Sequence, residues 1–125
     1  MLRFATAAVI AIAVGFACGD DADDFGVGAQ CAGNADCDPD TMQVCLQFKG
    51  GYCGIMGCTA DADCPDLSSC VAHSDGVNYC FRNCIDKGEC NRNRDPENEA
   101  NCSANITFVE PANNQGLKAC VPPSG

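Results

Sequence analysis

The stretch CTADADCPDLSSCVAHSDGVNYC, residues 58–80, contains four cysteines, and its pattern recurs on both sides of it. Between Cys31 and Cys120, three blocks each begin with two cysteines separated by five residues, and an acidic residue precedes the second cysteine every time. The block spacings are C-x5-C-x7-C-x7-C, C-x5-C-x5-C-x9-C and C-x5-C-x11-C-x17-C. Such recurrence indicates tandem repeats. We predict three four-cysteine modules, at residues 31–57, 58–83 and 84–125.

Each module also contains two segments of strand-like composition around a turn. Gly50-Gly51 and Asp75-Gly76 are dipeptides that favour two-residue hairpin turns. The segments are 44–49 and 52–55 around the first turn, 70–74 and 77–81 around the second, and 106–109 and 117–121 around a loop with Asn113, Asn114 and Gly116. We expect a small disulfide-rich fold with one short β-hairpin in each module and little other regular secondary structure.

The hairpin register limits how the cysteines pair. A two-residue turn at Gly50-Gly51 places Cys45 and Cys53 on opposite faces, and the second turn separates Cys70 from Cys80 in the same way. Third-to-fourth pairing is therefore disfavoured. First-to-third with second-to-fourth, first-to-fourth with second-to-third, and bridges between modules stay open. We favour the first of these, which gives Cys31–Cys45, Cys37–Cys53, Cys58–Cys70, Cys64–Cys80, Cys84–Cys102 and Cys90–Cys120.

The N-terminus is typical of a secretory signal peptide. One basic residue, Arg3, precedes the uncharged, apolar residues 4–16. An apolar stretch of that length is shorter than the ~20 residues that a membrane-spanning helix needs. We expect residues 1–17 to be removed.

The segment Gly15-Phe16-Ala17-Cys18 resembles the lipobox of bacterial lipoproteins, whose cysteine carries the lipid. Thirteen cysteines leave one unpaired, and lipidation of Cys18 accounts for it. The alternative is cleavage by ordinary signal peptidase, which would release a secreted protein with a free Cys18 thiol. The stretch that follows is rich in aspartate and glycine, so we expect residues 18–30 to form a flexible acidic tether.

Composition narrows the function further. The chain has 17 acidic and 7 basic residues, a net charge of −10, and loss of Arg3 makes it −11. Phosphate backbones would repel such a surface, so nucleic acid is excluded as a partner. Only sixteen of the 108 residues from Cys18 onward are Leu, Ile, Val or Phe. Disulfides must therefore replace much of the missing core, which places the protein in an oxidising, extracytoplasmic compartment.

The stretch from Cys58 to Cys80, with Asp63-Cys64-Pro65, resembles the four-cysteine repeats of EB-module and Dickkopf N-terminal cysteine-rich domains. These repeats have the form C-x4-D-C-P followed by a hairpin that contains glycine. The resemblance extends over Cys31 to Cys120, and with the lipobox-like segment the chain is similar to cysteine-rich lipoproteins of myxobacteria. It implies an extracellular location and an interaction role.

Two groups of carboxylates raise the possibility of calcium, which takes several oxygen ligands. An EF-hand-type loop that starts at Asp36 would have Thr41 and Gln47 at its glycine and glutamate positions, so that motif fails. The groups are Asp36, Asp38 and Asp40, and Asp61, Asp63 and Asp66. We favour a structural role, in which Asp36, Asp63 and Glu89 accept hydrogen bonds from nearby backbone N–H groups. Zinc would need closer and reduced cysteine pairs. We predict no metal and no cofactor.

Catalytic motifs are absent from the sequence, and its single histidine is His73. We therefore predict a non-enzymatic interaction or structural module at the cell envelope, with a protein or carbohydrate partner and a membrane contact through the lipid. One alternative is a secreted protease inhibitor with Lys49 or Arg82 as its contact residue; another is a calcium-stabilised structural module. The polar insert 91–101 is expected to be a solvated spacer.

Overall fold

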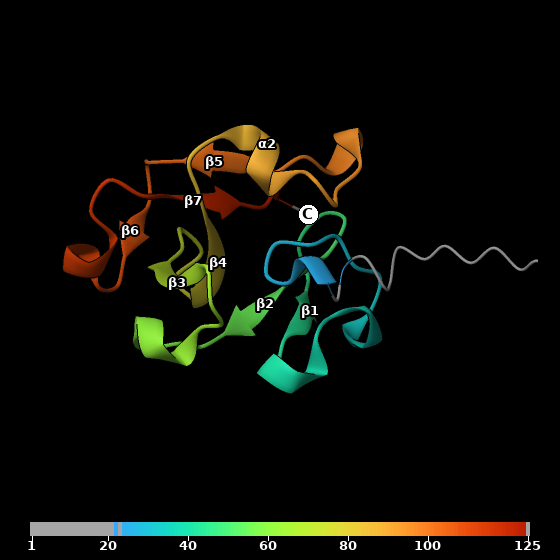
Figure 1. Cartoon of the computed structure of the whole chain (residues 1–125), viewed down its shortest axis with the longest axis horizontal. Helices are drawn as coiled ribbons and strands as arrows, with labels where there is room; N and C mark the ends of the chain where they lie inside the picture. Colours follow the sequence, from blue (N-terminus) through green and yellow to red (C-terminus); the bar gives the residue numbers. More distant parts are fainter. Residues whose placement is uncertain (1–21, 23, 125) are drawn as a thin grey trace, which may run out of the picture.

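The computed structural model describes residue 22 and residues 24–124 (Figure 1). The predicted signal peptide and Cys18 lie outside the described residues. The short helices are η1 (Asn34–Asp36), η2 (Pro39–Thr41), η3 (Asp61–Asp63), α2 (Lys87–Cys90), η4 (Pro96–Asn98) and η5 (Pro111–Asn114). The strands are β1 (Val44–Leu46), β2 (Tyr52–Met56), β3 (Ser68–Ala72), β4 (Asn78–Cys84), β5 (Asn101–Ser103), β6 (Thr107–Phe108) and β7 (Lys118–Val121). Across the described part of the chain, no helix has the length and apolarity to cross a membrane.

The strands form one antiparallel sheet whose hub is β4. The main order is β1-β2-β4-β3-β6, and β7 pairs with both β4 and β5. In Figure 1, β2 lies near one end of β4, where it pairs with Tyr79 and Cys80, and β7 lies near the other end, where it pairs with Asn83 and Cys84. Because β2 belongs to the first module and β7 to the third, backbone pairing joins all three modules. The predicted disulfide-rich fold with short antiparallel strands is confirmed.

Third and fourth cysteines lie directly opposite each other in all three modules. Cys45 is opposite Cys53, Cys70 is opposite Cys80, and Cys102 is opposite Cys120. The predicted register of the first two hairpins, which put these cysteines on opposite faces, is therefore wrong, by three residues in the first hairpin and by one residue in the second. A change in register by an odd number of residues moves every side chain to the other face of the sheet.

Longer turns cause this shift in register. In the second hairpin, His73 N–H bonds to Val77 O and Gly76 N–H to His73 O, which leaves a three-residue loop with Gly76 at φ 88°. In the first, Leu46 is opposite Tyr52, so the loop spans residues 47–51. Only glycine fits at Gly51, where φ is 73° and a Cβ would overlap the Cys31 carbonyl oxygen.

The third hairpin also differs from the prediction. Strand β7 pairs with β5, which carries Cys102, and not with residues 106–109. Within that segment, β6 pairs instead with β3, where Val71 lies opposite Phe108. The long connection between Cys102 and Cys120 lets the chain cross to the free edge of β3 and return, so that the pairing of third and fourth cysteine strands is kept.

Six disulfides cross-link the described residues: Cys31–Cys45, Cys37–Cys53, Cys58–Cys70, Cys64–Cys80, Cys84–Cys102 and Cys90–Cys120. They are the pairs favoured from the sequence. In the first two modules, side chains of the loop between the first and second cysteines hold the hairpin: Asn34 Oδ1 accepts from Cys45 N–H and Asp61 Oδ1 from Cys70 N–H, each at 2.9 Å. That loop thus lies over the cysteines of the hairpin, which therefore bond to it and not to each other.

The hydrophobic cluster that contains the largest buried side chains draws residues from all three modules. It comprises Val27 of the N-terminal segment, Leu46 and Tyr52 of the first module, Val71, Tyr79 and Phe81 of the second, and Ala119 of the third. Tyr52, Val71 and Phe81 are fully buried. The modules consequently pack together as one body.

Part of the predicted tether belongs to this body. Gly28 N–H donates to Cys53 O and Cys53 N–H donates to Ala29 O, both at 2.9 Å. Val27 and Ala29 are buried. Residues 24–30 are thus packed on the first module, and the glycines that favoured flexibility supply backbone turns instead, with φ of 86° at Gly26 and 98° at Gly28.

Candidate functional site

A buried arginine from the polar insert holds three parts of the chain together. Arg94 is only 8% exposed. Its guanidinium donates to four carbonyl oxygens: Asn98 at 2.7 Å, Gly51 at 2.8 Å, Lys49 at 2.9 Å and Gly28 at 3.3 Å. The first acceptor lies in the insert, the next two in the β1–β2 loop and the last in the N-terminal segment. The prediction of a solvated spacer at 91–101 is wrong, because its Arg94 is a central structural residue.

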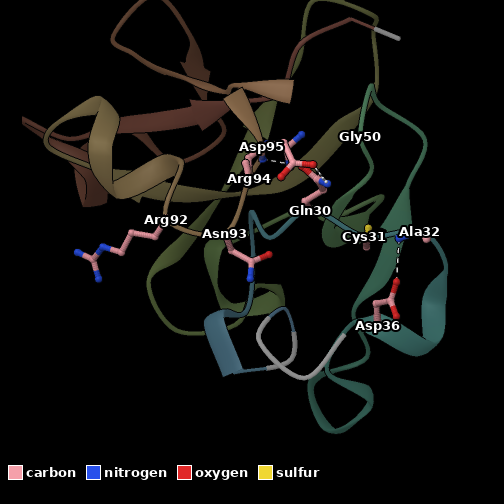
Figure 2. A pocket seen from close by; sticks show the side chains of 9 residues that line it. All are labelled: Gln30, Cys31, Ala32, Asp36, Gly50, Arg92, Asn93, Arg94 and Asp95. Atoms are coloured by element: carbon pink, nitrogen blue, oxygen red, sulfur yellow. Dashed lines mark hydrogen bonds between the residues drawn. The ribbon is translucent and has the colours of Figure 1, made fainter. Parts of the chain in front are cut away.

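Gln30 completes this junction. Its Nε2 donates to Asp95 Oδ2 at 3.0 Å, and its Oε1 accepts from Asp95 N–H at 2.8 Å and from Asn98 Nδ2 at 3.1 Å. Figure 2 shows Gln30 and Asp95 facing each other beside Arg94. Burial lowers the pKa of the Arg94 guanidinium, against an opposing effect of Tyr52. The guanidinium still stays charged near neutral pH, because arginine has the highest ordinary pKa of all side chains.

A cavity of about 550 Å³ lies over this junction. Its wall contains Gln30, Cys31, Ala32, Asp36, Gly50, Arg92, Asn93, Arg94 and Asp95. None of these lining residues supplies a hydroxyl or an imidazole, and the one cysteine is in a disulfide. In Figure 2 the side chain of the exposed Arg92 points away from those of Gln30 and Asp95. The cavity therefore offers amide, carboxylate and guanidinium groups for polar contacts, without a nucleophile next to a base.

A second guanidinium fixes the start of the described chain. Arg82 Nη1 donates to Phe25 O at 2.9 Å, and its guanidinium carbon lies 4.1 Å from the centre of the Phe25 ring. Beneath it, the buried Tyr52 hydroxyl accepts from Arg82 N–H and donates to Cys120 O. Burial raises the pKa of Tyr52. Of the two residues suggested as inhibitor contacts, Arg82 is half-buried in this arrangement, whereas Lys49 is exposed in the β1–β2 loop.

The acidic residue before the second cysteine has the role expected from the sequence. Asp36 Oδ2 accepts from the N–H groups of residues 32 and 33, Asp63 Oδ2 from those of residues 59 and 60, and Glu89 Oε1 from those of residues 85 and 86. In each module the carboxylate thus closes the turn between the first two cysteines. The predicted hydrogen-bonding role of these acids is confirmed.

Other candidate metal ligands are also engaged within the protein. Both oxygens of Asp61 accept hydrogen bonds, from Cys70 N–H and from Asn114 Nδ2. Within the described ranges, the groups of three potential ligands that lie within 4.8 Å of one another consist of cysteines, and all of these are in disulfides. His73 lies among aromatic rings, 5.7 Å from Phe48 and 5.3 Å from Phe81 between ring centres. It has a packing role there.

Acid should weaken the second module through Asp63. Hydrogen bonds from the Thr59 N–H and hydroxyl, and then from the Ala60 N–H, hold the pKa of Asp63 below its ordinary value of 3.8. A depressed pKa contributes stability that is present above the unfolded-state pKa and is lost as pH falls through the folded-state value. Asp63→Asn should lower the Tm at pH 7 by a few degrees, because a neutral amide accepts these bonds more weakly, and should flatten the decline of Tm below about pH 4.

The matched control for this change is Asp66→Asn, which removes an exposed carboxylate from the same module. Its Tm should follow that of the unmodified protein between pH 7 and pH 2, as measured by circular dichroism with the disulfides intact. Equal pH profiles for the Asp63 variant and the unmodified protein would contradict the capping role in stability.

Comparisons with protein-family models, with curated proteins and with solved structures give no match. The fold and the six disulfides define a small, disulfide-stabilised protein suited to an oxidising or extracellular environment.

Proposed function

We propose that this protein is an extracytoplasmic binding module, held at the cell envelope by a lipid on Cys18 and without enzymatic activity. The observation that carries the proposal is the joining of three modules into one cross-linked body by six disulfides and a shared core. A rigid scaffold of this kind displays loops that lose little conformational entropy when they bind.

The cavity at the Arg94 junction supports a binding role over a catalytic one. Its polar groups suit a peptide or a carbohydrate, since both offer hydrogen-bond donors and acceptors. The net charge of −10 argues against nucleic acid as the partner. The lipobox-like Gly15-Phe16-Ala17-Cys18 and the odd number of cysteines support the lipid anchor.

Mass spectrometry of the native protein tests the anchor. We expect a chain that starts at Cys18, carries a diacylglyceryl group and an acyl chain there, and holds its other twelve cysteines in six disulfides. Cys18→Ser should lose the lipid and leave the membrane fraction, while its six disulfides remain. A free Cys18 thiol on a secreted protein, or thirteen unmodified thiols, would contradict the proposal.

A further inference from the structure

Two exposed apolar side chains stand on strained backbone at matching places in the first two modules. Met42 and Leu67 each lie three residues before the third cysteine of their module. Their φ angles are 61° and 67°, and they are the only non-glycine residues with positive φ in the described parts of the chain. Their exposed fractions are 80% and 68%. Neither side chain contributes its apolar surface to the core.

The left-handed conformation is disfavoured for bulky residues, whereas glycine and asparagine adopt it readily. The backbone needs the left-handed conformation at Met42 and Leu67, because each of these residues closes a turn that leads into a strand. Met42 N–H bonds to Pro39 O, and Ser68 N–H bonds to Pro65 O around Leu67. A turn alone would be served better by glycine or asparagine. Methionine and leucine at these two positions therefore lower the stability of the fold, and their side chains make no packing contribution to the core that would offset this.

Acidic residues lie next to both positions in the sequence. Asp38 and Asp40 belong to the turn before Met42, and Asp66 directly precedes Leu67; Asp40 and Asp66 are exposed. In the third module, the position three residues before the third cysteine is Glu99, which has φ −62° and an ion pair with Lys87. The combination of strained backbone, apolar tip and adjacent acid is thus confined to the first two modules in the described structure.

We propose that residues 38–42 and 65–67, the two display turns, are contact points for a protein partner whose apolar side chains are flanked by lysine or arginine. The apolar tips bury surface on contact, and the carboxylates favour basic neighbours on the partner. Both turns belong to one rigid body, so a partner that engages both gains from the second contact. This inference rests on the proposed binding function and names its partner class.

A peptide titration with the full-length protein, its disulfides intact, tests the display turns. The probe is a short synthetic peptide of lysine and leucine at physiological salt, where the Debye length is about 8 Å and distant charges are screened. The double variant Met42→Asn, Leu67→Asn should bind it about tenfold more weakly or worse. Its Tm should stay equal or rise by up to about 5 °C, because asparagine relieves the backbone strain.

Ile85→Asn is the matched control, since Ile85 is 73% exposed but has no positive φ. It should leave the affinity unchanged. The inference is overturned if the unmodified protein does not bind the peptide, if a lysine and serine peptide binds equally well, if Ile85→Asn weakens binding as much as the double variant, or if the double variant melts at a clearly lower temperature. Because Cys18→Ser should bind the peptide normally, these outcomes are separate from failure of the lipid anchor.

Discussion

Full reduction should unfold this protein at room temperature without denaturant. A disulfide that closes a loop of the sizes found here, with sequence separations of 12 to 30, contributes about 3 to 4 kcal/mol in the chain-entropy treatment. Net stabilities of small domains are only about 5–15 kcal/mol. Six such contributions therefore exceed what the small core around Tyr52 and Phe81 can replace. Loss of native circular dichroism and of protease resistance after reduction with dithiothreitol is the measurement.

Two variants that each lack one disulfide give a matched comparison. Replacing Cys90 and Cys120 by alanine opens a loop with a separation of 30, and replacing Cys58 and Cys70 opens one of 12. The first change should cost about 3.7 kcal/mol and the second about 2.9 kcal/mol, as measured by urea denaturation. A fully reduced protein that keeps its circular dichroism spectrum and a cooperative melt would show that the core alone determines the fold.

The disulfide pairs were predicted correctly from the sequence, although the hairpin register used to favour them was wrong. The register expected at Gly50-Gly51 separated Cys45 from Cys53, yet these residues lie directly opposite each other. Their disulfides still go elsewhere because the loop between the first two cysteines, held by Asn34 or Asp61, covers the hairpin. Recurrent cysteine spacing indicates modules. It does not fix turn length, which depends on contacts between separate segments of the chain, such as that of Gly51 with Cys31.

The role of the acidic residue before the second cysteine of each module was predictable from the sequence, whereas the different roles of the two arginines in the insert were not. Asp36, Asp63 and Glu89 recur at a fixed place before a cysteine, and a local hydrogen-bonding role follows from that regularity. Arg92 and Arg94 stand in the same polar segment, each between two polar residues, and nothing local distinguishes them. Only the packing of the insert against the β1–β2 loop buries one and exposes the other.

Arg94→Ala should therefore be among the most destabilising single substitutions of a residue that is not in a disulfide. It removes four hydrogen bonds from a charged donor and leaves the carbonyl groups of Gly28, Lys49 and Gly51 without that partner. Hydrogen bonds to charged groups contribute more than neutral ones, and buried acceptors left unpaired add a penalty. We expect a loss of about 3–4 kcal/mol, which corresponds to a fall in Tm of roughly 15 °C or more for a domain of this size.

Two variants make the Arg94 prediction specific. Arg92→Ala removes the same charge from the exposed neighbour and should change the stability by less than about 0.5 kcal/mol. Arg94→Lys keeps the charge but lacks the planar fork that reaches several carbonyls at once, so its stability should fall between those of the unmodified protein and Arg94→Ala. Amide hydrogen exchange of Gly28 and Cys53, whose N–H groups hold the N-terminal segment on β2, should rise in Arg94→Ala. Equal urea midpoints for Arg92→Ala and Arg94→Ala would mean that the buried guanidinium does not hold the three segments together.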